Sequence, residues 1–206
     1  DPADPEALAS GVVSGLAQDP RGTVWVGTYQ SGVHRQDPGR SGFRRYTREH
    51  GLPTLQIEYL YVARNGVLWV GTGDGLLRFD PERDRFVALV DANGNAPQVR
   101  VNGLAEENDG RLWIATSGGL YAIEPGSDEL RVLQRGAGGA EGLVSDHVAS
   151  VLVDRRGRLW VDTAKGLQRL HREAGREWFE DLSDRLGIAG QGLGGSLDHV
   201  QAPAQL

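Results

Sequence analysis

Short apolar runs recur along the whole chain, and glycine, aspartate, asparagine and proline separate them at regular intervals. β-Branched and aromatic residues fill the runs, and no stretch carries a sustained helical periodicity. This pattern is typical of short strands joined by tight turns. Four of the runs are centred on a tryptophan, at Trp25, Trp69, Trp113 and Trp160. The chain is therefore expected to be all-β and repetitive, with these tryptophans as structural residues of the repeat.

The four tryptophans mark copies of one repeat. In each copy a glycine lies three residues before the tryptophan and a threonine three residues after it, as in Gly66-Val-Leu-Trp69-Val-Gly-Thr72. Successive tryptophans are 44, 44 and 47 residues apart. A period of about 45 residues is typical of propeller blades, which hold four short strands each. We therefore predict a partial β-propeller of four four-stranded blades plus the first strand of a fifth.

The blade limits follow from the repeat. Residues 1–10 are predicted to be an N-terminal linker, followed by blades at about 11–50, 51–94, 95–138 and 139–186 and by the start of blade five at 187–206. Strands are expected near 12–18, 23–28, 32–36 and 42–47 in the first blade, near 57–63, 67–72, 75–80 and 84–90 in the second, within 99–134 in the third, and near 147–153, 158–163, 166–171 and 176–181 in the fourth. In the last segment Trp178, Leu182 and Leu186 at four-residue spacing could instead mark a short helical turn.

The position two residues after each tryptophan is expected to face the neighbouring blade. It holds Gly27 and Gly71 in the first two copies and Ala115 in the third, which fits close packing between blades. Asp162 occupies this position in the fourth copy, where a carboxylate needs a partner or solvent. Asp162 is either an accident at the edge of the repeat or a local functional choice.

Composition narrows the possible partners. The 206 residues carry a net charge of −6, and no block of lysine or arginine interleaves with aromatic residues, so we exclude nucleic acid. No apolar run is long enough to span a bilayer, so contact with a membrane is expected only through parts absent from this chain. There is no cysteine, which excludes disulfides and thiolate metal sites. The chain starts at Asp1 and contains no methionine, so we expect it to be an internal segment of a longer protein.

The repeat closely resembles the two-component regulator propeller repeat. The clearest copies are residues 13–19, Val-Ser-Gly-Leu-Ala-Gln-Asp, and residues 68–80, Leu-Trp-Val-Gly-Thr-Gly-Asp-Gly-Leu-Leu-Arg-Phe-Asp. The segments 51–53 and 141–146 also resemble the linkers between blades in that family. The resemblance implies an extracytoplasmic sensor propeller of a histidine kinase or diguanylate cyclase receptor, on the periplasmic or extracellular side of a bacterial inner membrane.

Ligand residues are expected at one end of the blades. In propellers the turns between the second and third strands, and the linkers between blades, lie together around the central channel. Such turns here present a different side chain in each copy, as a recognition surface would. The candidates for contact with an unknown small molecule or glycan are Tyr29, Gln30, Asp74, Lys165 and His147.

The sequence offers little support for metal binding or acid–base catalysis. The five histidines, at 34, 50, 147, 171 and 199, lack metal-ligand spacing, so no metal or cofactor is predicted. Residues 91–95, Asp-Ala-Asn-Gly-Asn, begin like a calcium loop but lack its later glycine and glutamate, and are interpreted as an Asx-rich turn. The adjacent carboxylates Glu106 and Glu107 should point to opposite faces of a strand, which is a poor geometry for shared acid–base catalysis.

Three functions remain open at this point. The first is a non-catalytic sensor or interaction module. The second is an enzyme similar to streptogramin lyases, which are propellers with a related repeat; His147 is the one histidine that we would nominate for it. The third is a purely structural module. Four blades leave open faces, so we expect self-association through them.

Overall fold

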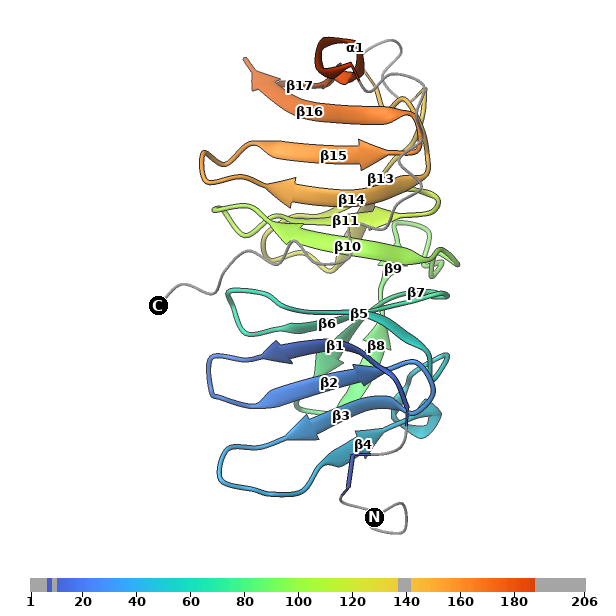
Figure 1. Ribbon diagram of the computed structural model, residues 1–206, viewed down its shortest axis with the longest axis vertical. Coiled ribbons are helices and arrows are strands. Elements are labelled where there is room, and N and C mark those ends of the chain that lie inside the picture. The colour runs from blue at the N-terminus through green and yellow to red at the C-terminus, as the bar shows by residue number, and fades with distance from the viewer. Residues whose placement is uncertain (1–6, 9–10, 137–141, 188–206) are drawn as a thin grey trace.

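The protein consists of four antiparallel sheets arranged in a row (Figure 1). This computed structural model describes residues 7–8, 11–136 and 142–187. Blade 1 contains β1 (Val13–Gln18), β2 (Val24–Thr28), β3 (Gly32–Gln36) and β4 (Arg44–Tyr46), and blade 2 contains β5 (Ile57–Val62), β6 (Leu68–Thr72), β7 (Gly75–Asp80) and β8 (Arg85–Ala88). Blade 3 contains β10 (Val101–Glu106), β11 (Leu112–Thr116), β12 (Gly119–Ile123) and β13 (Glu129–Leu133), and blade 4 contains β14 (Val148–Val153), β15 (Leu159–Thr163), β16 (Gly166–Glu173) and β17 (Arg176–Asp181). The all-β propeller prediction is confirmed, and the strands lie close to the predicted ranges.

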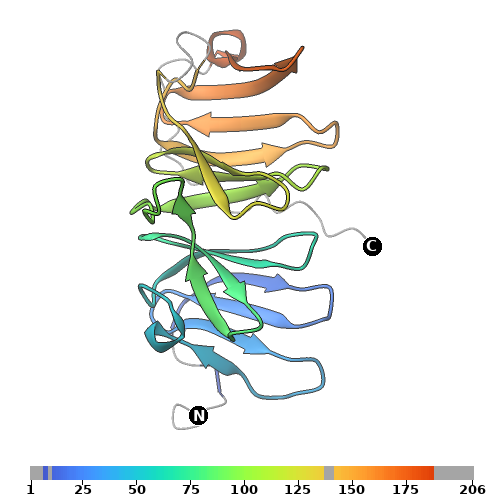
Figure 2. The same ribbon diagram turned by 180° about the vertical axis from the view of Figure 1, so that it is seen from behind.

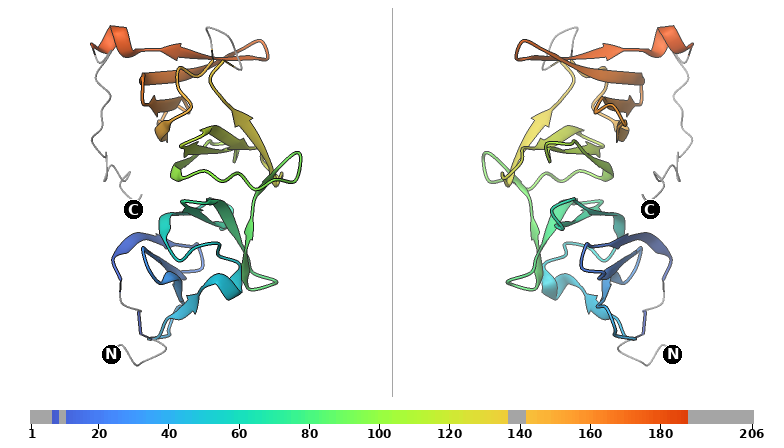
Figure 3. Two further views of the ribbon diagram at one scale, coloured as in Figure 1. Left: turned by 90° about the vertical axis from the view of Figure 1, so that its right-hand side faces the viewer. Right: turned by 90° about the vertical axis from the view of Figure 1, so that its left-hand side faces the viewer.

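The row of blades is curved. Figure 3 shows an arc with the innermost strands β1, β5, β10 and β14 on its concave side, and Figure 2 shows β8 and β13 on the outer side. Blades 1 and 4 lie at opposite ends of the row, so these four blades form an open arc. The predicted fifth blade, 187–206, lies outside the described residues except for Gly187.

Three short elements add detail that the repeat does not show. β9 (Val90–Asp91) pairs in parallel with β13, so the sheet of blade 3 has five strands, one of them from the segment predicted to belong to blade two. The 3-10 helix η1 (Arg48–His50) lies in the linker between blades 1 and 2. In blade 4 the strand β17 is followed directly by the short helix α1 (Ser183–Leu186), so both predictions for this segment are partly correct.

The two ends of each blade differ in their turns. We call the end with the β2–β3 type of turn and the blade-to-blade linkers the linker end, on the right in Figure 1, and the opposite end the hairpin end. At the hairpin end, Gly22 has a φ of 87°, a left-handed conformation that glycine adopts without strain. Asp19 Oδ1 accepts hydrogen bonds from the backbone N–H groups of Arg21 and Thr23, both at 2.9 Å. The hairpin turn is therefore fixed by its own sequence.

The repeated threonine fixes the linker end. Thr116 is fully buried, and its hydroxyl donates to the carbonyl of Gly119 at 2.7 Å while accepting from the N–H of Gly118 at 3.1 Å. Equivalent bonds hold the turns that follow Thr28, Thr72 and Thr163. The threonine hydroxyl thus makes two hydrogen bonds in each turn, which explains why threonine closes each copy of the repeat.

The tryptophans of blades 1, 2 and 3 pack on the following blade. Trp25 lies edge-on to Phe79 of blade 2, with ring centroids 4.8 Å apart. A Cβ atom added at Gly71 would lie 2.7 Å from Val101 Cγ1 of blade 3, so the small residue in the slot is required by close approach. The predicted role of this slot between blades is confirmed.

Each innermost strand also contains a β-bulge near its start. The bulged residues are Ser14, Glu58, Asn102 and Ala149. Two of them reach the next blade, because Glu58 accepts from Arg100 at 2.9 Å and Asn102 donates to the carbonyl of Val148 at 2.8 Å. The bulges thus provide polar contacts between blades along the wall of the arc.

Candidate functional site

The residues predicted to bind a ligand all lie at the linker end. Tyr29 and Gln30 are in the β2–β3 turn, Asp74 in the β6–β7 turn and Lys165 in the β15–β16 turn, while His147 directly precedes β14. The turns are held by the threonine bonds described above. These five residues come from three blades, and no hydrogen bond between described residues joins any two of them.

Two hollows lie instead at the hairpin end, each between neighbouring blades. The first has a volume of about 420 Å³ and lies between blades 2 and 3. The second has a volume of about 490 Å³ and lies between blades 3 and 4. Both are lined from two blades, so occupancy of either would bear directly on how those blades pack.

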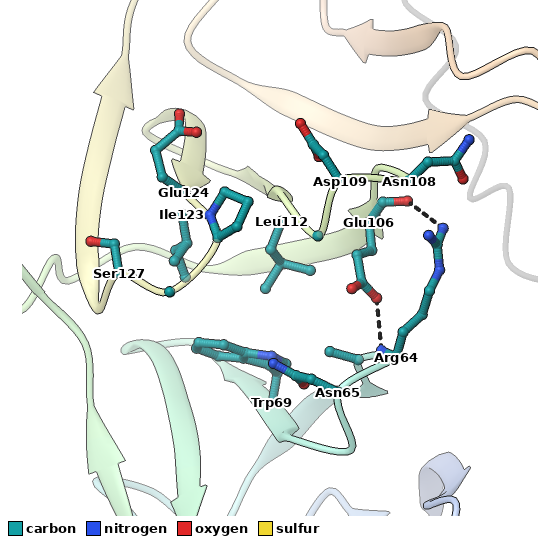
Figure 4. A pocket seen from close by; sticks show the side chains of 14 residues that line it. Arg64, Asn65, Trp69, Glu106, Asn108, Asp109, Leu112, Ile123, Glu124 and Ser127 are labelled. Atoms are coloured by element: carbon teal, nitrogen blue, oxygen red, sulfur yellow. Dashed lines mark hydrogen bonds between the residues drawn. The ribbon is translucent and has the colours of Figure 1, made fainter.

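The hollow between blades 2 and 3 has an apolar floor and a polar rim (Figure 4). Trp69, which is 6% exposed, lies at its base together with the buried Leu112 and Ile123. The rim is made of polar and charged side chains, namely Arg64, Asn65, Asn108, Asp109, Glu124 and Ser127. The buried indole Nε1 of Trp69 has no hydrogen-bond partner, as is also true of Trp25 and Trp113. This is the combination of surfaces found in sites for small polar molecules.

Side-chain volume explains why the hollow is here. Between blades 1 and 2, Trp25 packs against Phe79, and Phe86 packs on Phe79 in the same core cluster; the two phenyl rings come from the third and fourth strands of blade 2. The equivalent positions in blade 3 are Ile123 and Leu130. Two aliphatic side chains fill less volume than two phenyl rings, so space remains beside Trp69.

Glu106 anchors one wall of this hollow to blade 2. Its Oε2 accepts from the N–H of Arg64 at 2.9 Å and from the hydroxyl of Tyr61 at 3.3 Å, and its carbonyl accepts from the guanidinium of Arg64 at 3.3 Å (Figure 4). Burial, followed by the nearby Glu106 charge, raises the pKa of Tyr61 to about 12. Glu107, the next residue, instead pairs with Arg172 of blade 4 at 2.9 Å. The predicted opposite orientation of these two carboxylates is confirmed, and it ties blade 3 to both neighbours.

The hollow between blades 3 and 4 is lined by arginine. Arg111 and Arg131 of blade 3 and Arg172 and Arg176 of blade 4 surround Glu177. Burial disfavours the charge of Glu177, but hydrogen bonds from Arg172, Arg131 and Arg111 outweigh it and lower the pKa of Glu177 to about 2. Nothing in the repeat predicts this cluster, because its members are distant in sequence.

The outer face of blade 4 differs from the three internal joints. Trp160 is half-buried and donates from Nε1 to Asp154 at 3.0 Å, and the guanidinium of Arg158 lies 5.4 Å from its ring centroid. Asp162 lies half-buried on the same face, and burial raises the pKa of its carboxyl group. Leu152 beside them is 54% exposed. The fourth copy therefore ends the described row with a partly polar face.

The remaining sequence predictions can be placed as well. Asp91 Oδ1 accepts from the N–H groups of Asn93 and Asn95, both at 2.9 Å, so this segment is an Asx-rich turn as predicted. Within the described residues, no three histidine, aspartate or glutamate side chains are arranged to hold a metal ion. The described part of the chain also contains no helix that is long and apolar enough to cross a bilayer.

The family comparison agrees with the repeat. Residues 7–30 and 95–118 match the family model of the two component regulator propeller. These stretches include the first two strands of blades 1 and 3. These two stretches therefore match the two component regulator propeller repeat, and the resemblance drawn from the tryptophan motif is confirmed.

Solved structures show the same fold. The extracellular domain of the hybrid two component system BT3049 from B. thetaiotaomicron is 20% identical, with a TM-score of 0.70 over 92% of this chain and 24% of that chain. The extracellular domain of BT4673 from the same organism is 22% identical, with a TM-score of 0.66 over 88% of this chain and 24% of that chain. Virginiamycin B lyase from Staphylococcus aureus is 13% identical, with a TM-score of 0.57 over 82% of this chain and 55% of that chain. The chain thus spans about a quarter of the two extracellular domains, and no curated protein sequence matches it.

Proposed function

We propose that this chain is part of an extracytoplasmic sensor propeller of a two component signalling receptor, and that it binds a small molecule or glycan unit without transforming it. The matching repeats and the similarity of the fold to extracellular domains of hybrid two component systems support this proposal. The same similarities support a location of this segment on the periplasmic or extracellular side of the membrane.

The observation that carries the binding role is the hollow over Trp69. Its volume of about 420 Å³ is within the range of small-molecule sites, and its aromatic floor and polar rim suit a ligand with both apolar and hydroxyl or amide surfaces. The unpartnered N–H of Trp69 is a donor that such a ligand would satisfy after a small rearrangement.

The position of the hollow suggests how binding would be sensed. Trp69 belongs to blade 2, whereas Leu112 and Ile123 belong to blade 3. A ligand that contacts both walls binds one arrangement of the two blades more tightly than others, and this difference in affinity is what shifts a conformational equilibrium. The signal would then be a change in the angle between blades.

Filling the hollow tests the proposal. Monosaccharides, disaccharides and amino acids are screened against the chain by ligand-observed NMR, and each hit is measured again with Ile123→Phe, which restores the bulk that Phe79 supplies between blades 1 and 2. We expect hits to lose their signal while the variant stays folded by circular dichroism. If the binding signal is lost with Asp74→Ala or Lys165→Ala instead, the ligand binds at the linker end. Hits that survive all three substitutions would contradict both sites.

Self-association and the absence of catalysis are further parts of the proposal. Leu16 of β1 is 62% exposed and Leu152 of β14 is 54% exposed, at the two ends of the row. We propose that the chain self-associates through these open faces, and light scattering over a dilution series should then show a mass above that of the 22.3 kDa monomer. A monomer at all concentrations would contradict this. His147 is the histidine that we nominate for the lyase alternative. We expect the unmodified chain to leave the ligand chemically unchanged; turnover that His147→Ala abolishes would favour the lyase instead.

A further inference from the structure

In three of the four blades a guanidinium group lies over the ring of the repeat tryptophan. The face of an indole ring is electronegative and attracts a cation within about 6 Å of its centroid. The three pairs, with the distance from the guanidinium carbon to the ring centroid, are Arg35 and Trp25 at 5.4 Å, Arg111 and Trp113 at 5.8 Å, and Arg158 and Trp160 at 5.4 Å. In the described part of the chain, Trp69 has no such cation over its ring. Blade 2 therefore lacks an interaction that the other three blades make.

The repeat explains this difference. The position two residues before the tryptophan holds Arg111 and Arg158 in blades 3 and 4 but Val67 in blade 2, where it packs into the joint with blade 3. The residue opposite the tryptophan on the third strand is an arginine in blade 2, as it is in blade 1. In blade 2, however, this residue is Arg78, which pairs with Asp128 of blade 3 at 2.8 Å. Neither position therefore supplies a cation to the ring of blade 2.

The hollow beside this ring is acidic. Three carboxylates line it, those of Glu106, Asp109 and Glu124, against one arginine, Arg64. Arg111 pairs with Glu124 at 3.0 Å from outside the lining. One negative charge remains when Arg111 is counted fully against Glu124 and Arg64 fully against one further carboxylate. Asp109 Oδ1 accepts from the N–H of Arg111 at 3.0 Å, and with the described residues its carboxylate forms no ion pair. A negative charge beside an aromatic face favours a cationic ligand.

We propose that the hollow over Trp69 binds a small ligand through an ammonium group, which lies over the indole ring where the other blades place an arginine. Asp109 balances its charge at the rim, and the apolar part of the ligand lies against Leu112 and Ile123. Because the ring belongs to blade 2 and these three residues to blade 3, the ligand links the two blades. This inference rests on the proposed function, since it takes the same hollow as the binding site, and it adds the chemical class of the ligand.

Choline and its neutral carbon analogue, in which a tert-butyl group replaces the trimethylammonium group, serve as the probes. The two compounds have the same shape and differ in charge. Each is titrated against the chain by ligand-observed NMR at constant ionic strength. We expect choline to bind about fivefold or more tightly than the analogue, because the analogue has no charge for the ring face and the carboxylate to attract.

The rim carboxylate is tested by Asp109→Asn, which should weaken choline binding about twofold or more and leave the neutral analogue unchanged. The substitution keeps the turn, because Asn65 Oδ1 accepts from the N–H of Val67 at 3.0 Å in blade 2 as Asp109 Oδ1 accepts in blade 3. Glu49→Gln is the matched control. It removes one negative charge from an exposed side chain of η1 at the linker end, and it should leave both affinities unchanged.

The place over the ring is tested by Val67→Arg, which gives blade 2 the arginine that blades 3 and 4 have at this position. It should weaken choline binding about tenfold or more, because the guanidinium of the chain then takes the place of the ligand. Val67→Leu adds volume without charge and should keep the preference for choline. If Val67→Arg fails to fold, the contrast between Asp109→Asn and Glu49→Gln decides alone.

The outcomes separate this inference from the proposed function. Equal affinity for choline and its analogue, or choline binding that Val67→Arg leaves unchanged, would overturn the inference. A neutral sugar that binds the unmodified chain and is lost with Ile123→Phe, together with no binding of choline, would overturn the inference and leave the proposed function standing. No binding of any of these compounds would contradict both.

Discussion

Close packing between blades 2 and 3 can be tested with a single methyl group. A Cβ atom at residue 71 would lie 2.7 Å from Val101 Cγ1, 2.8 Å from Val101 Cβ and 3.2 Å from Tyr59 Cβ. Carbon atoms in contact prefer about 3.5–4.0 Å, so Val101 would have to move by roughly 1 Å. Val101 is 1% exposed and lies at the start of β10, where the strand restricts such a shift. We therefore expect Gly71→Ala to lower the free energy of unfolding by about 1–3 kcal/mol.

The assay is urea unfolding followed by tryptophan fluorescence, with Gly103→Ala as the control. A Cβ atom at Gly103, also in β10, would meet no heavy atom within 4 Å, so this variant should stay within about 0.5 kcal/mol of the unmodified chain. Val101→Ala combined with Gly71→Ala should cost less than the sum of the two single substitutions, because it removes Val101 Cγ1, the nearest clashing atom, although Val101 Cβ remains. A cost for Gly71→Ala no larger than that of Gly103→Ala would refute the packing argument for this joint.

Three other measurements address single side chains. Thr116→Val should lose about 1–3 kcal/mol in urea unfolding, because it leaves the N–H of Gly118 and the carbonyl of Gly119 without their partner, whereas Thr116→Ser should retain most of the stability. The lowered pKa of Glu177 means that its contribution to stability is present above its ordinary value of 4.5 and is lost as the pH falls toward about 2, so Glu177→Gln should remove this part of the acid unfolding profile. Burial raises the pKa of Asp162, so its charge destabilises the folded state at neutral pH; Asp162→Asn should be more stable than the unmodified chain at pH 7, and a gain that does not shrink as the pH falls would contradict this cause.

Most of the backbone could be predicted from the sequence because the features that set it are local and repeated. The hairpin turn needs only Asp19 and Gly22 in the right order, and the linker-end turn needs only the threonine after each tryptophan. The bulges could not be predicted in this way. Their residues, Ser14, Glu58, Asn102 and Ala149, share no chemical property, so the bulge is a property of the innermost strand and not of a residue type.

The candidate sites were harder to predict because they depend on side chains that meet across blades. Variable turns drew attention to the linker end, whereas both hollows lie at the hairpin end. The hollow over Trp69 has a readable signal, since Ile123 stands where Phe79 stands one repeat earlier. The arginine cluster has none, because Arg111 and Glu177 are 66 residues apart and only the packing of blade 4 on blade 3 joins them.

The four tryptophans occupy the same position in the repeat but have different side chains around them. This difference bears on which joint between blades can move. Trp25 contacts the rings of Phe79 and Tyr46 and has Arg35 over its ring, and Trp113 lies under Arg111 and Arg172. Among the described residues, no cation lies over Trp69 and no aromatic side chain of blade 3 packs on it as Phe79 packs on Trp25. The ring of Trp69 therefore has fewer aromatic and cationic neighbours than the rings of Trp25 and Trp113, and regions with few such contacts are the ones that ligands can reorganise at low cost. The hollow over Trp69 thus lies beside the tryptophan with the fewest aromatic and cationic neighbours, as the proposed ligand-controlled hinge between blades 2 and 3 requires.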